Sequence, residues 1–387
     1  MRLLNVLHIC NNYYGTSVYI DLVNELNNNN IGNYVLVVLP NNKNYLSTID
    51  INKSTKNLDT IIIPNIVNNL SKFFPIIRVL FLFQLVKKYK KVNIDIIHSH
   101  TLYSNGSMGR WLSNILAIPH ISSIRNVDIN TVYKNLIYYR KSFLKKIAIG
   151  NNVFPNKAYV NFVTNEMEKK NINMKSINIS IIPNSVDHFW LENKYQAKQV
   201  KENVVTILFV GEFTSNKNID FLLDVFATQW LENIKFEVKI IGYLNSKWKG
   251  NQKYYEHIQS RVENIDNIKM LDKVTEKEVL LEHYRNSDIF FMTSFYETFG
   301  LVYVEAMSQG LPIIYTRGQG IDGFYQEGDI GFPVDPTNVE QARSCIESVI
   351  DNYQKISQNC VSFVDDFSKE VNINKLINIY KDARDNK

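Results

Sequence analysis

Two glutamates eight positions apart, Glu297 and Glu305, lie in the stretch SFYETFGLVYVEAMSQGLP at residues 294–312. The run DIFFMTS before them is typical of a buried strand, and LVYVEAMSQG is typical of a helix. We therefore expect the helix to begin near Phe299 or Gly300. A helix N-terminus carries unpaired amides and a partial positive charge, which suit a phosphate group, and glycine lets an anion approach the backbone.

The spacing of the two acids suggests a sugar nucleotide. Glu305 is expected about five residues into the helix, roughly 7.5 Å from its start, whereas Glu297 lies on the preceding loop. Each carboxylate can accept paired hydrogen bonds from neighbouring hydroxyls. A nucleoside diphosphate sugar has sugar hydroxyls, a diphosphate and ribose hydroxyls in that order. The alternative is a capping box from Ser294 to Glu297, with Glu305 exposed on the helix.

A lysine follows another predicted strand in VGEFTSNKNIDFLLDVF. The strand ends near Gly211, and the loop that carries Lys217 leads into a helix. At about 4 Å and an effective dielectric constant near 20, a lysine attracts one phosphate charge by about 4 kcal/mol before desolvation. Lys217 is thus a candidate phosphate ligand, and a solvated loop lysine is the alternative.

Two histidines end a strand in DIIHSHTLYSNGS, His98 and His100. They are expected at the carboxyl end of a strand, where ligands of parallel sheets bind. A structural role is the alternative. The His-x-His spacing also raises zinc, but we find no third ligand cluster and expect no metal.

Short Val/Ile/Leu-rich runs alternate with amphipathic ones along the chain, which favours parallel sheets covered by helices. We expect an α/β protein with two doubly wound, Rossmann-like domains facing across a cleft. The predicted strands are LLNVLHIC, YVLVVLP, TIIIP, IDIIHSH, HISSI, KIAIG and NISIIPN, then VVTILFVGE, EVKIIGY, NIKML, DIFFMTS, LPIIYTR and IGFPV.

The polar segment between the two sets of strands places the domain boundaries. We predict an N-terminal domain at residues 1–187, a linker at 188–203 and a C-terminal domain at 204–365. A final amphipathic helix at 366–387 is expected to brace the domains.

Charge is unevenly distributed over the 387 residues. Residues 1–190 hold 21 Lys/Arg and 9 Asp/Glu, a net charge of +12, and the remainder has a net charge of −7. We find no nucleic-acid-binding signature. Basic residues accompany aromatic ones at 73–91 and 136–146. These two segments could contact an anionic membrane, and the alternative is that they are helices whose basic faces are solvated.

The three cysteines are scattered along the chain. We find no cleavable leader and no apolar stretch of about 18 residues. These features favour a cytoplasmic protein, which could lie at the inner face of the cell membrane.

Four motifs together resemble the retaining glycosyltransferases of family 4, which have the GT-B fold. SFYETFGLVYVEAMSQGLPII is similar to their E-x7-E signature, and FVGEFTSNKNID to their Gly…Lys phosphate loop. IIPNSVD resembles the segment before their second domain, and DIIHSH their histidine-bearing strand end. The resemblance covers nearly the whole chain, in the family's order.

The resemblance implies a role for each matching residue. Glu297 would hold the hydroxyls of the donor sugar, and Glu305 the ribose. His100 would contact the transferred sugar. The residues near the phosphates would be Lys217, Gly211, Gly15 and the backbone of Thr298, Phe299, Gly300 and Leu301.

Three departures from the family pattern concern the phosphates, the base and the linker. Glu212 stands where many members have arginine, and Arg317 is the candidate to replace that phosphate contact. GYLN at 242–245 replaces the usual G-x-G, and Ser185 replaces a glycine.

We expect a metal-independent, retaining glycosyltransferase of bacterial capsule, exopolysaccharide or lipopolysaccharide synthesis. It would use a UDP- or GDP-linked sugar and a glycan acceptor carried on a lipid, with no other cofactor. A sugar-nucleotide epimerase of the same architecture and a non-enzymatic two-lobed sugar-binding protein are the alternatives.

Overall fold

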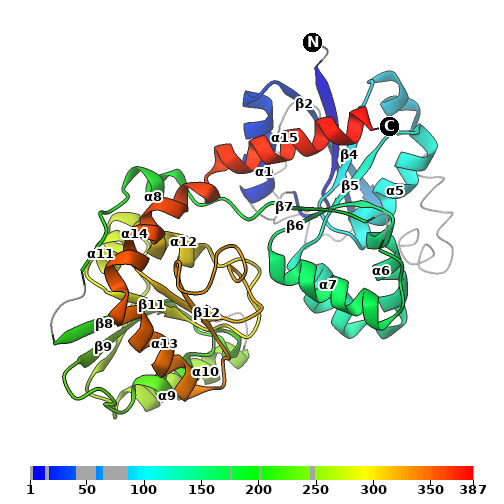
Figure 1. Ribbon diagram of the computed structural model, residues 1–387. Helices are drawn as coiled ribbons and strands as arrows, with labels where there is room; N and C mark the ends of the chain where they lie inside the picture. Colours follow the sequence, from blue (N-terminus) through cyan, green and yellow to red (C-terminus); the bar gives the residue numbers. More distant parts are fainter. Residues whose placement is uncertain are drawn as a thin grey trace. The chain divides into compact units, whose positions relative to one another are not determined.

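The chain forms two compact units in the computed structural model, which describes residues 3–13, 17–40, 58–63, 86–174, 177–199, 203–244 and 249–386 (Figure 1). The first unit comprises Met1–Phe154, Phe162–Ile182 and Ile373–Lys387, and the second comprises Pro155–Asn161 and Pro183–Asn372. Each unit is built on one parallel sheet, so the expected α/β fold with two Rossmann-like domains is confirmed.

The sheet of the first unit has seven strands in the order β3-β2-β1-β4-β5-β6-β7. All neighbouring strands are parallel, and in the register of β1 and β4 His8 pairs with His98. The strands are β1 Leu4–Ile9, β2 Ile31–Pro40, β3 Leu58–Ile63, β4 Ile96–Ser99, β5 His120–Ser123, β6 Asn151–Phe154 and β7 Asn178–Ile181.

The side chains of β1 alternate between two apolar layers, as the two-residue period of a strand requires. Leu4 and Val6 pack in a layer that includes Leu376 and Tyr380 of the C-terminal helix. Leu7 and Ile9 pack in another layer with Leu112. The sheet is therefore buried on both faces, which explains the nearly continuous apolar strand sequences.

Helices connect the strands of the first unit. They are α1 Ser17–Asn28, α5 Ser104–Leu116, the π-helix η2 Val127–Tyr133, the 3-10 helix η3 Ile137–Tyr139, α6 Arg140–Ala148 and α7 Lys157–Lys169, whose first turns belong to the second unit.

The predicted strand KIAIG at 146–150 is wrong. Its first three residues end α6, and the strand β6 is the following NNVF. Phe143, Leu144, Ile147 and Ala148 are the buried residues of α6. Their i, i+1, i+4, i+5 spacing buries one face of a helix, and the short apolar run is only the end of that face.

The sheet of the second unit has six parallel strands in the order β10-β9-β8-β11-β12-β13. Each of the six runs predicted as strands coincides with most or all of one strand. The strands are β8 Val204–Glu212, β9 Lys235–Tyr243, β10 Ile268–Leu271, β11 Ile289–Met292, β12 Ile313–Thr316 and β13 Gly331–Val334.

One continuous core holds the second unit together, and it includes Trp190 from the segment predicted as a linker. That segment begins with a short helix because Asp187 caps it, accepting a hydrogen bond from the Phe189 amide at 3.0 Å. The helices of the unit are α8 His188–Glu192, the 3-10 helix η4 Ser215–Lys217, α9 Ile219–Phe226, α10 Lys249–Val262, α11 Lys277–Arg285, α12 Leu301–Ser308, α13 Val339–Asp351, α14 Tyr353–Phe363 and the 3-10 helix η5 Val364–Phe367.

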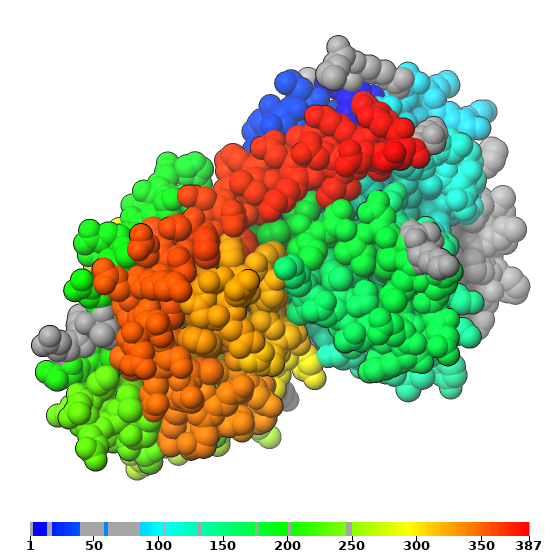
Figure 2. Space-filling view, in the orientation of Figure 1, coloured from blue at the N-terminus to red at the C-terminus, as the bar shows by residue number. Residues whose placement is uncertain are grey.

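The C-terminal helix α15 (Lys369–Asp385) belongs to both units. Its first residues are part of the second unit, where the side-chain amide of Asn372 donates to the Pro183 carbonyl at 3.1 Å. From Ile373 onwards it lies on the first unit, and Figure 2 shows its red residues against the blue N-terminal ones. No helix among the described residues is long and apolar enough to cross a membrane.

Candidate functional site

The order of the strands in the second unit reverses between β8 and β11. The chain winds outward from β8 through β9 to β10, then returns to the other side of β8 with β11. In open parallel sheets ligands bind at the carboxyl ends of the strands where this reversal occurs. The loops that leave β8 and β11 are the ones that carry Lys217 and Glu297.

Asn216 holds these two loops together. Its carbonyl accepts from the Phe295 amide at 2.9 Å, and its side-chain amide donates to the Tyr296 carbonyl at 3.0 Å. The Tyr296 amide returns a hydrogen bond to the side-chain oxygen of Asn216 at 3.0 Å. The sequence analysis missed this residue, although an asparagine next to the candidate lysine was a signal for a loop contact.

Lys217 and Glu297 form an ion pair at this place, with 2.7 Å between Nζ and Oε2. Their side chains are 21% and 14% exposed, so the pair is partly withdrawn from water but still reachable. The structure brings together two residues that lie 80 positions apart in the chain. A cation and an acid side by side can contact a phosphate and a sugar hydroxyl of one ligand.

The loop at 319–320 holds the backbone of Glu297 by two hydrogen bonds. The Glu297 amide donates to the side-chain oxygen of Gln319 at 3.1 Å, and the Gly320 amide donates to the Glu297 carbonyl at 3.0 Å. Gly320 has a φ of +55°, and a Cβ there would lie 3.1 Å from Cγ of Glu297. The site needs glycine at this position, which the sequence analysis did not identify.

The predicted helix start at Gly300 agrees with the structure, where Gly300 caps α12 with a φ of +80°. The first amides of an α-helix have no acceptor within the helix, so those of Leu301 and Val302 are suited to an anion. The Thr298 amide instead donates to Oε1 of Glu297 at 3.1 Å, and the Phe299 side chain is buried in the core. Gly211 lies in β8 beside Lys217.

The capping-box alternative is wrong. Ser294 lies six residues before the N-cap Gly300, and its carbonyl accepts from the Thr316 hydroxyl at 2.8 Å. No hydrogen bond of its hydroxyl is found among the described residues. The interval between β11 and α12 is thus a loop, and Glu297 is free of a capping role.

Glu305 lies at the fifth position of α12 and is partly buried. The Tyr284 hydroxyl donates to its Oε2 at 3.1 Å. Burial raises the pKa of Glu305 to about 7, and the nearby Asp187 acts in the same direction, against the Tyr284 hydrogen bond and Lys277. A carboxyl with this pKa carries its charge only part of the time at neutral pH, and it can accept from a diol when ionised.

Glu212 and Arg317, the two residues that concern the expected phosphate contact, form hydrogen bonds or ion pairs with nearby residues. Glu212 accepts from the Asn251 side chain at 3.3 Å. Arg317 is paired with Glu327 at 2.5 Å and also donates to the Pro333 carbonyl at 3.2 Å. The candidate replacement cation is therefore engaged beside β13.

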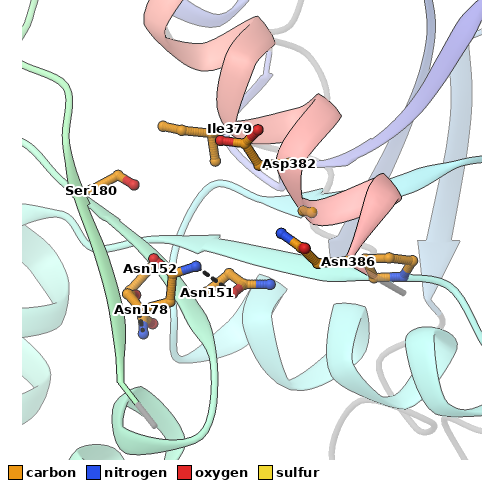
Figure 3. Close-up of a pocket in the computed structure, with 9 residues that line it drawn as sticks. Asn151, Asn152, Asn178, Ser180, Ile379, Asp382 and Asn386 are labelled. Atoms are coloured by element: carbon orange, nitrogen blue, oxygen red, sulfur yellow. Dashed lines mark hydrogen bonds between the residues drawn. The ribbon is translucent and has the colours of Figure 1, made fainter.

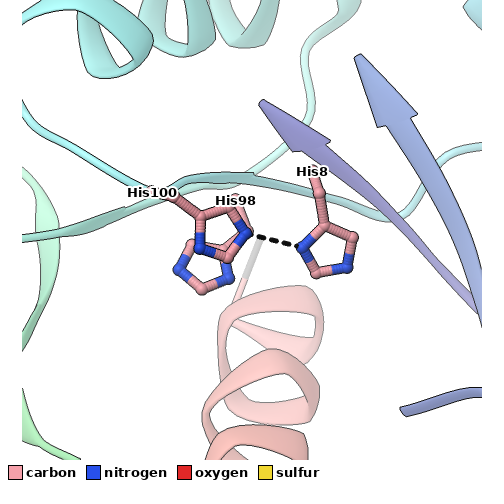
Figure 4. Close-up of side chains that lie close together, drawn as sticks. All are labelled: His8, His98 and His100. Carbon is pink, nitrogen blue, oxygen red and sulfur yellow. Dashed lines mark hydrogen bonds between the residues drawn. The ribbon is translucent and has the colours of Figure 1, made fainter. Parts of the chain in front are cut away.

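The first unit has the same reversal, between β1 and β4, and His100 directly follows β4 there. Gly15 lies outside the described residues. His98 and His100 project to one side of the sheet because they are two positions apart. His8 of β1 joins them, as Figure 4 shows, and is a third possible ligand that the search for a third ligand cluster in the sequence did not find. A histidine inside the first predicted strand was the signal.

One ring nitrogen from each of the three histidines lies within 4.8 Å of the others, but most of their ring nitrogens are engaged in hydrogen bonds. His98 uses one ring nitrogen with the Tyr380 hydroxyl at 2.6 Å and the other with the Ser123 hydroxyl at 2.8 Å. His8 uses one with Asn33 at 2.9 Å and the other with His100 at 3.0 Å. Only Nδ1 of His100 has no partner among the described residues. The arrangement fits a hydrogen-bonded cluster better than a three-histidine zinc site.

A polar pocket of about 250 Å³ lies elsewhere in the first unit (Figure 3). Asn151 and Asn178 in its wall are the first residues of β6 and β7, and Asp382 and Asn386 come from the C-terminal segment. The pocket is therefore at the amino ends of the strands, the edge opposite to His100. None of the predicted site residues lines it.

Two family models match the chain and together cover most of it. Residues 16–188 match Glycosyltransferase Family 4, and residues 192–365 match Glycosyl transferases group 1. The second match contains Lys217, Glu297 and Glu305, and the first contains His100.

Curated and solved relatives agree with these matches. An uncharacterised 41.2 kDa protein in the cps region of Klebsiella pneumoniae is 26% identical, over 98% of this chain and 99% of its own. The UDP-Gal:alpha-D-GlcNAc-diphosphoundecaprenol alpha-1,3-galactosyltransferase of Escherichia coli is 24% identical over 84% of each. The crystal structure of Anabaena Alr3699/HepE in complex with UDP has a TM-score of 0.67 at 15% identity, over 99% of this chain and 100% of that one.

Proposed function

We propose that the chain acts as a glycosyltransferase. It belongs to the glycosyltransferases, because its first half matches Glycosyltransferase Family 4 and its second half matches Glycosyl transferases group 1. It moves a sugar from a nucleoside diphosphate sugar to a hydroxyl of a growing surface polysaccharide. The observation that carries this proposal is the pair of Lys217 and Glu297, 2.7 Å apart at the reversal of the second sheet and next to the start of α12.

The diphosphate of the donor would be held by Lys217 and the first amides of α12. Both present positive charge at the carboxyl ends of β8 and β11, and Gly300 leaves the backbone open to a phosphate oxygen. Negative charge grows on the leaving diphosphate as the sugar departs. A fixed ammonium group and fixed amides stabilise that charge without reorganisation, so no metal ion is required in this proposal.

The hydroxyls of the donor would be held by the two acids. Glu297 faces Lys217, so a sugar hydroxyl bound to it stays next to the phosphate that Lys217 contacts. Glu305, inside α12, would accept from the ribose hydroxyls. Arg317 is assigned no phosphate contact because Glu327 already pairs with it at 2.5 Å.

The reaction would retain the configuration of the sugar. No described side chain next to Lys217 and Glu297 is a covalent nucleophile, because Glu297 is engaged by the ammonium group and by the Thr298 amide. We therefore assign the deprotonation of the acceptor hydroxyl to an oxygen of the departing diphosphate, with attack on the face that the diphosphate leaves. His100 would contact the transferred sugar.

The acceptor would be carried on a membrane lipid diphosphate. The relative from Klebsiella pneumoniae is named for a cps region, and the one from Escherichia coli acts on a diphosphoundecaprenol-linked sugar. Both support a surface-polysaccharide pathway.

The 3-10 helix η3 of the first unit has no buried residue, and its apolar side chains face solvent. Ile137 and Tyr138 in this helix are 67% and 98% exposed.

These two side chains adjoin a basic surface that favours an anionic bilayer. Lys141 and Lys145 of α6 are exposed, while Phe143 and Leu144 between them are buried. Aromatic and apolar tips beside lysines are typical of a surface that lies on a membrane. The net charge of +12 in residues 1–190 supports the same partner.

The membrane proposal is tested by sedimentation with vesicles of anionic and of zwitterionic lipid at low salt. The Lys141→Glu variant should bind anionic vesicles about fivefold or more weakly, since one lysine near the surface contributes about 1 kcal/mol. Val279→Ser removes an exposed apolar side chain of the second unit and serves as the control. Equal binding of all variants, or no binding by the wild type, refutes the proposed surface.

The transfer proposal is tested with a panel of nucleotide sugars, first by thermal shift and then by turnover with and without lipid diphosphate acceptors. Consumption of donor only when an acceptor is present supports transfer, whereas isomerised free donor would support an epimerase. Lys217→Ala should abolish turnover, with exposed Lys355→Ala as the control. Wild-type turnover in Lys217→Ala refutes the assignment, and tight binding with no turnover of any donor would favour a sugar-binding protein.

A further inference from the structure

His8 lies at the centre of a chain of hydrogen bonds that starts at the surface and ends at His100. Asn33 donates from Nδ2 to the Ile31 carbonyl at 2.9 Å and to the Asn27 side chain at 2.8 Å. A carbonyl oxygen can only accept, so these contacts identify Nδ2 of Asn33, and its Oδ1 is the acceptor that faces His8. His8 must therefore carry a proton on Nε2, which lies 2.9 Å from that oxygen.

The same reasoning determines the proton on His100. His8 is completely buried, and burial lowers its pKa to about 4, so at neutral pH the ring has one proton. That proton is on Nε2, which leaves Nδ1 of His8 as an acceptor. Nε2 of His100 lies 3.0 Å from it and must donate (Figure 4).

The remaining nitrogen of His100 is then a bare acceptor. Burial and the neighbouring histidines hold the pKa of His100 well below its usual value, so the ring is neutral and Nδ1 has no proton. This atom is buried and has no hydrogen-bond partner among the described residues. Buried acceptors without a partner are rare in proteins, and such an atom at the carboxyl end of β4 points to a ligand hydroxyl.

We propose that His8 is a positioning residue of the transfer reaction: with Asn33, it holds His100 in the one tautomer that presents Nδ1 to a hydroxyl of the transferred sugar. This inference rests on the proposed function for its ligand. The tautomer itself follows from the hydrogen bonds alone.

His98 is not part of this chain of hydrogen bonds. Its two ring nitrogens contact the hydroxyls of Tyr380 and Ser123, which can each donate or accept. It packs against the His100 ring with 4.4 Å between ring centroids. His98 thus supports the position of His100 without determining its proton.

The tautomer is tested by NMR on the full chain labelled with ¹⁵N-histidine, with the His100 signals assigned by their loss in His100→Gln. A protonated and an unprotonated imidazole nitrogen have distinct shifts. We expect protonated Nε2 and unprotonated Nδ1 in the wild type near neutral pH, and a mixture in His8→Phe, which has no acceptor. Protonated Nδ1 in the wild type, or no change in His8→Phe, overturns the proposal.

The effect on the reaction is tested with the same variants. His8→Phe should lower kcat about tenfold, because His100 loses its assigned tautomer, and leave the affinity for the free nucleoside diphosphate unchanged. His8→Asn keeps an acceptor oxygen near the position of Nδ1 and should recover most of the loss. A His8 that only fills space would be replaced better by phenylalanine than by asparagine, so higher kcat in His8→Phe than in His8→Asn refutes positioning.

Two further results distinguish a failure of the proposed function from a failure of the His8 proposal. If the wild type shows the expected tautomer but no donor is turned over, the proposed function fails while the hydrogen-bond assignment stands. If the purified chain retains one equivalent of Zn²⁺ that His8→Phe loses, the lone pair of His100 belongs to a metal and the proposal is wrong. If His8→Phe does not fold, the tautomer of the wild type still decides.

Discussion

Replacing Glu305 by glutamine should stabilise the second unit, and increasingly so as the pH rises. Burial raises the pKa of this carboxyl from 4.5 to about 7, against the hydrogen bond from the Tyr284 hydroxyl. Glutamine keeps an acceptor for Tyr284 and has no charge to bury. The variant therefore isolates the cost of ionising Glu305 inside the folded protein.

The sign follows from the protons bound in each state. Between pH 4.5 and about 7 the folded chain binds a proton at Glu305 that the unfolded chain has lost, so the free energy of unfolding falls as the pH rises through this window. Each tenfold change in the acid dissociation constant is about 1.4 kcal/mol, so the wild type loses up to about 3 kcal/mol relative to Glu305→Gln. Below about pH 4.5 both states hold the proton and the difference closes.

Urea unfolding of both proteins from about pH 5 to about pH 8 measures this difference. Tryptophan fluorescence in a Trp111→Phe background reports on the second unit, because Trp190 and Trp230 pack in its core and Trp111 packs in the first unit. Glu347→Gln, at an exposed position of α13, should give a difference from the wild type that does not change with pH. A stability difference for Glu305→Gln that is constant with pH, or that shrinks above pH 7, would refute the burial argument.

Three other substitutions test the construction of the two units. Lys217→Met should lower kcat/KM at least about a hundredfold in a donor-turnover assay, since it removes the charge facing Glu297 and the leaving diphosphate, and an unchanged circular dichroism spectrum should accompany the loss. Gly300→Ala should cost about 1–2 kcal/mol for the left-handed backbone alone, and its Cβ would also clash with the Tyr303 ring. A thermal midpoint equal to that of the wild type would contradict the cap. Asp128→Ala should destabilise the first unit by about 3 kcal/mol because the amides of Leu102, Tyr103 and Arg125 lose their acceptor, and unaltered hydrogen exchange at these amides would exclude this.

The strands of the second unit were predictable because each is a short apolar run bounded by turn residues. The same rule failed at 146–150, where the apolar residues are the end of one face of α6. A run of three or four apolar residues is shared by strands and by helix ends. Only the packing of Phe143 and Leu144, one turn earlier, decides between them.

The features of the candidate site that depend on neighbouring residues in the chain could also be predicted from the sequence. A helix start at Gly300, an acid before it, an acid within it and a lysine after an earlier strand are all statements about neighbours in the chain. Each rests on backbone rules that act over a few residues, so each could be inferred from one stretch of sequence.

Contacts across the sheet required the tertiary structure. The pairing of Lys217 with Glu297, the Tyr284 hydroxyl on Glu305 and the joining of His8 to His100 all connect different strands or helices. They depend on which strands become neighbours, and the strand order in a parallel sheet is set by the burial of whole elements rather than by any local pattern. For the same reason the proton on His100 follows from an asparagine two strands away, which no spacing in the sequence indicates.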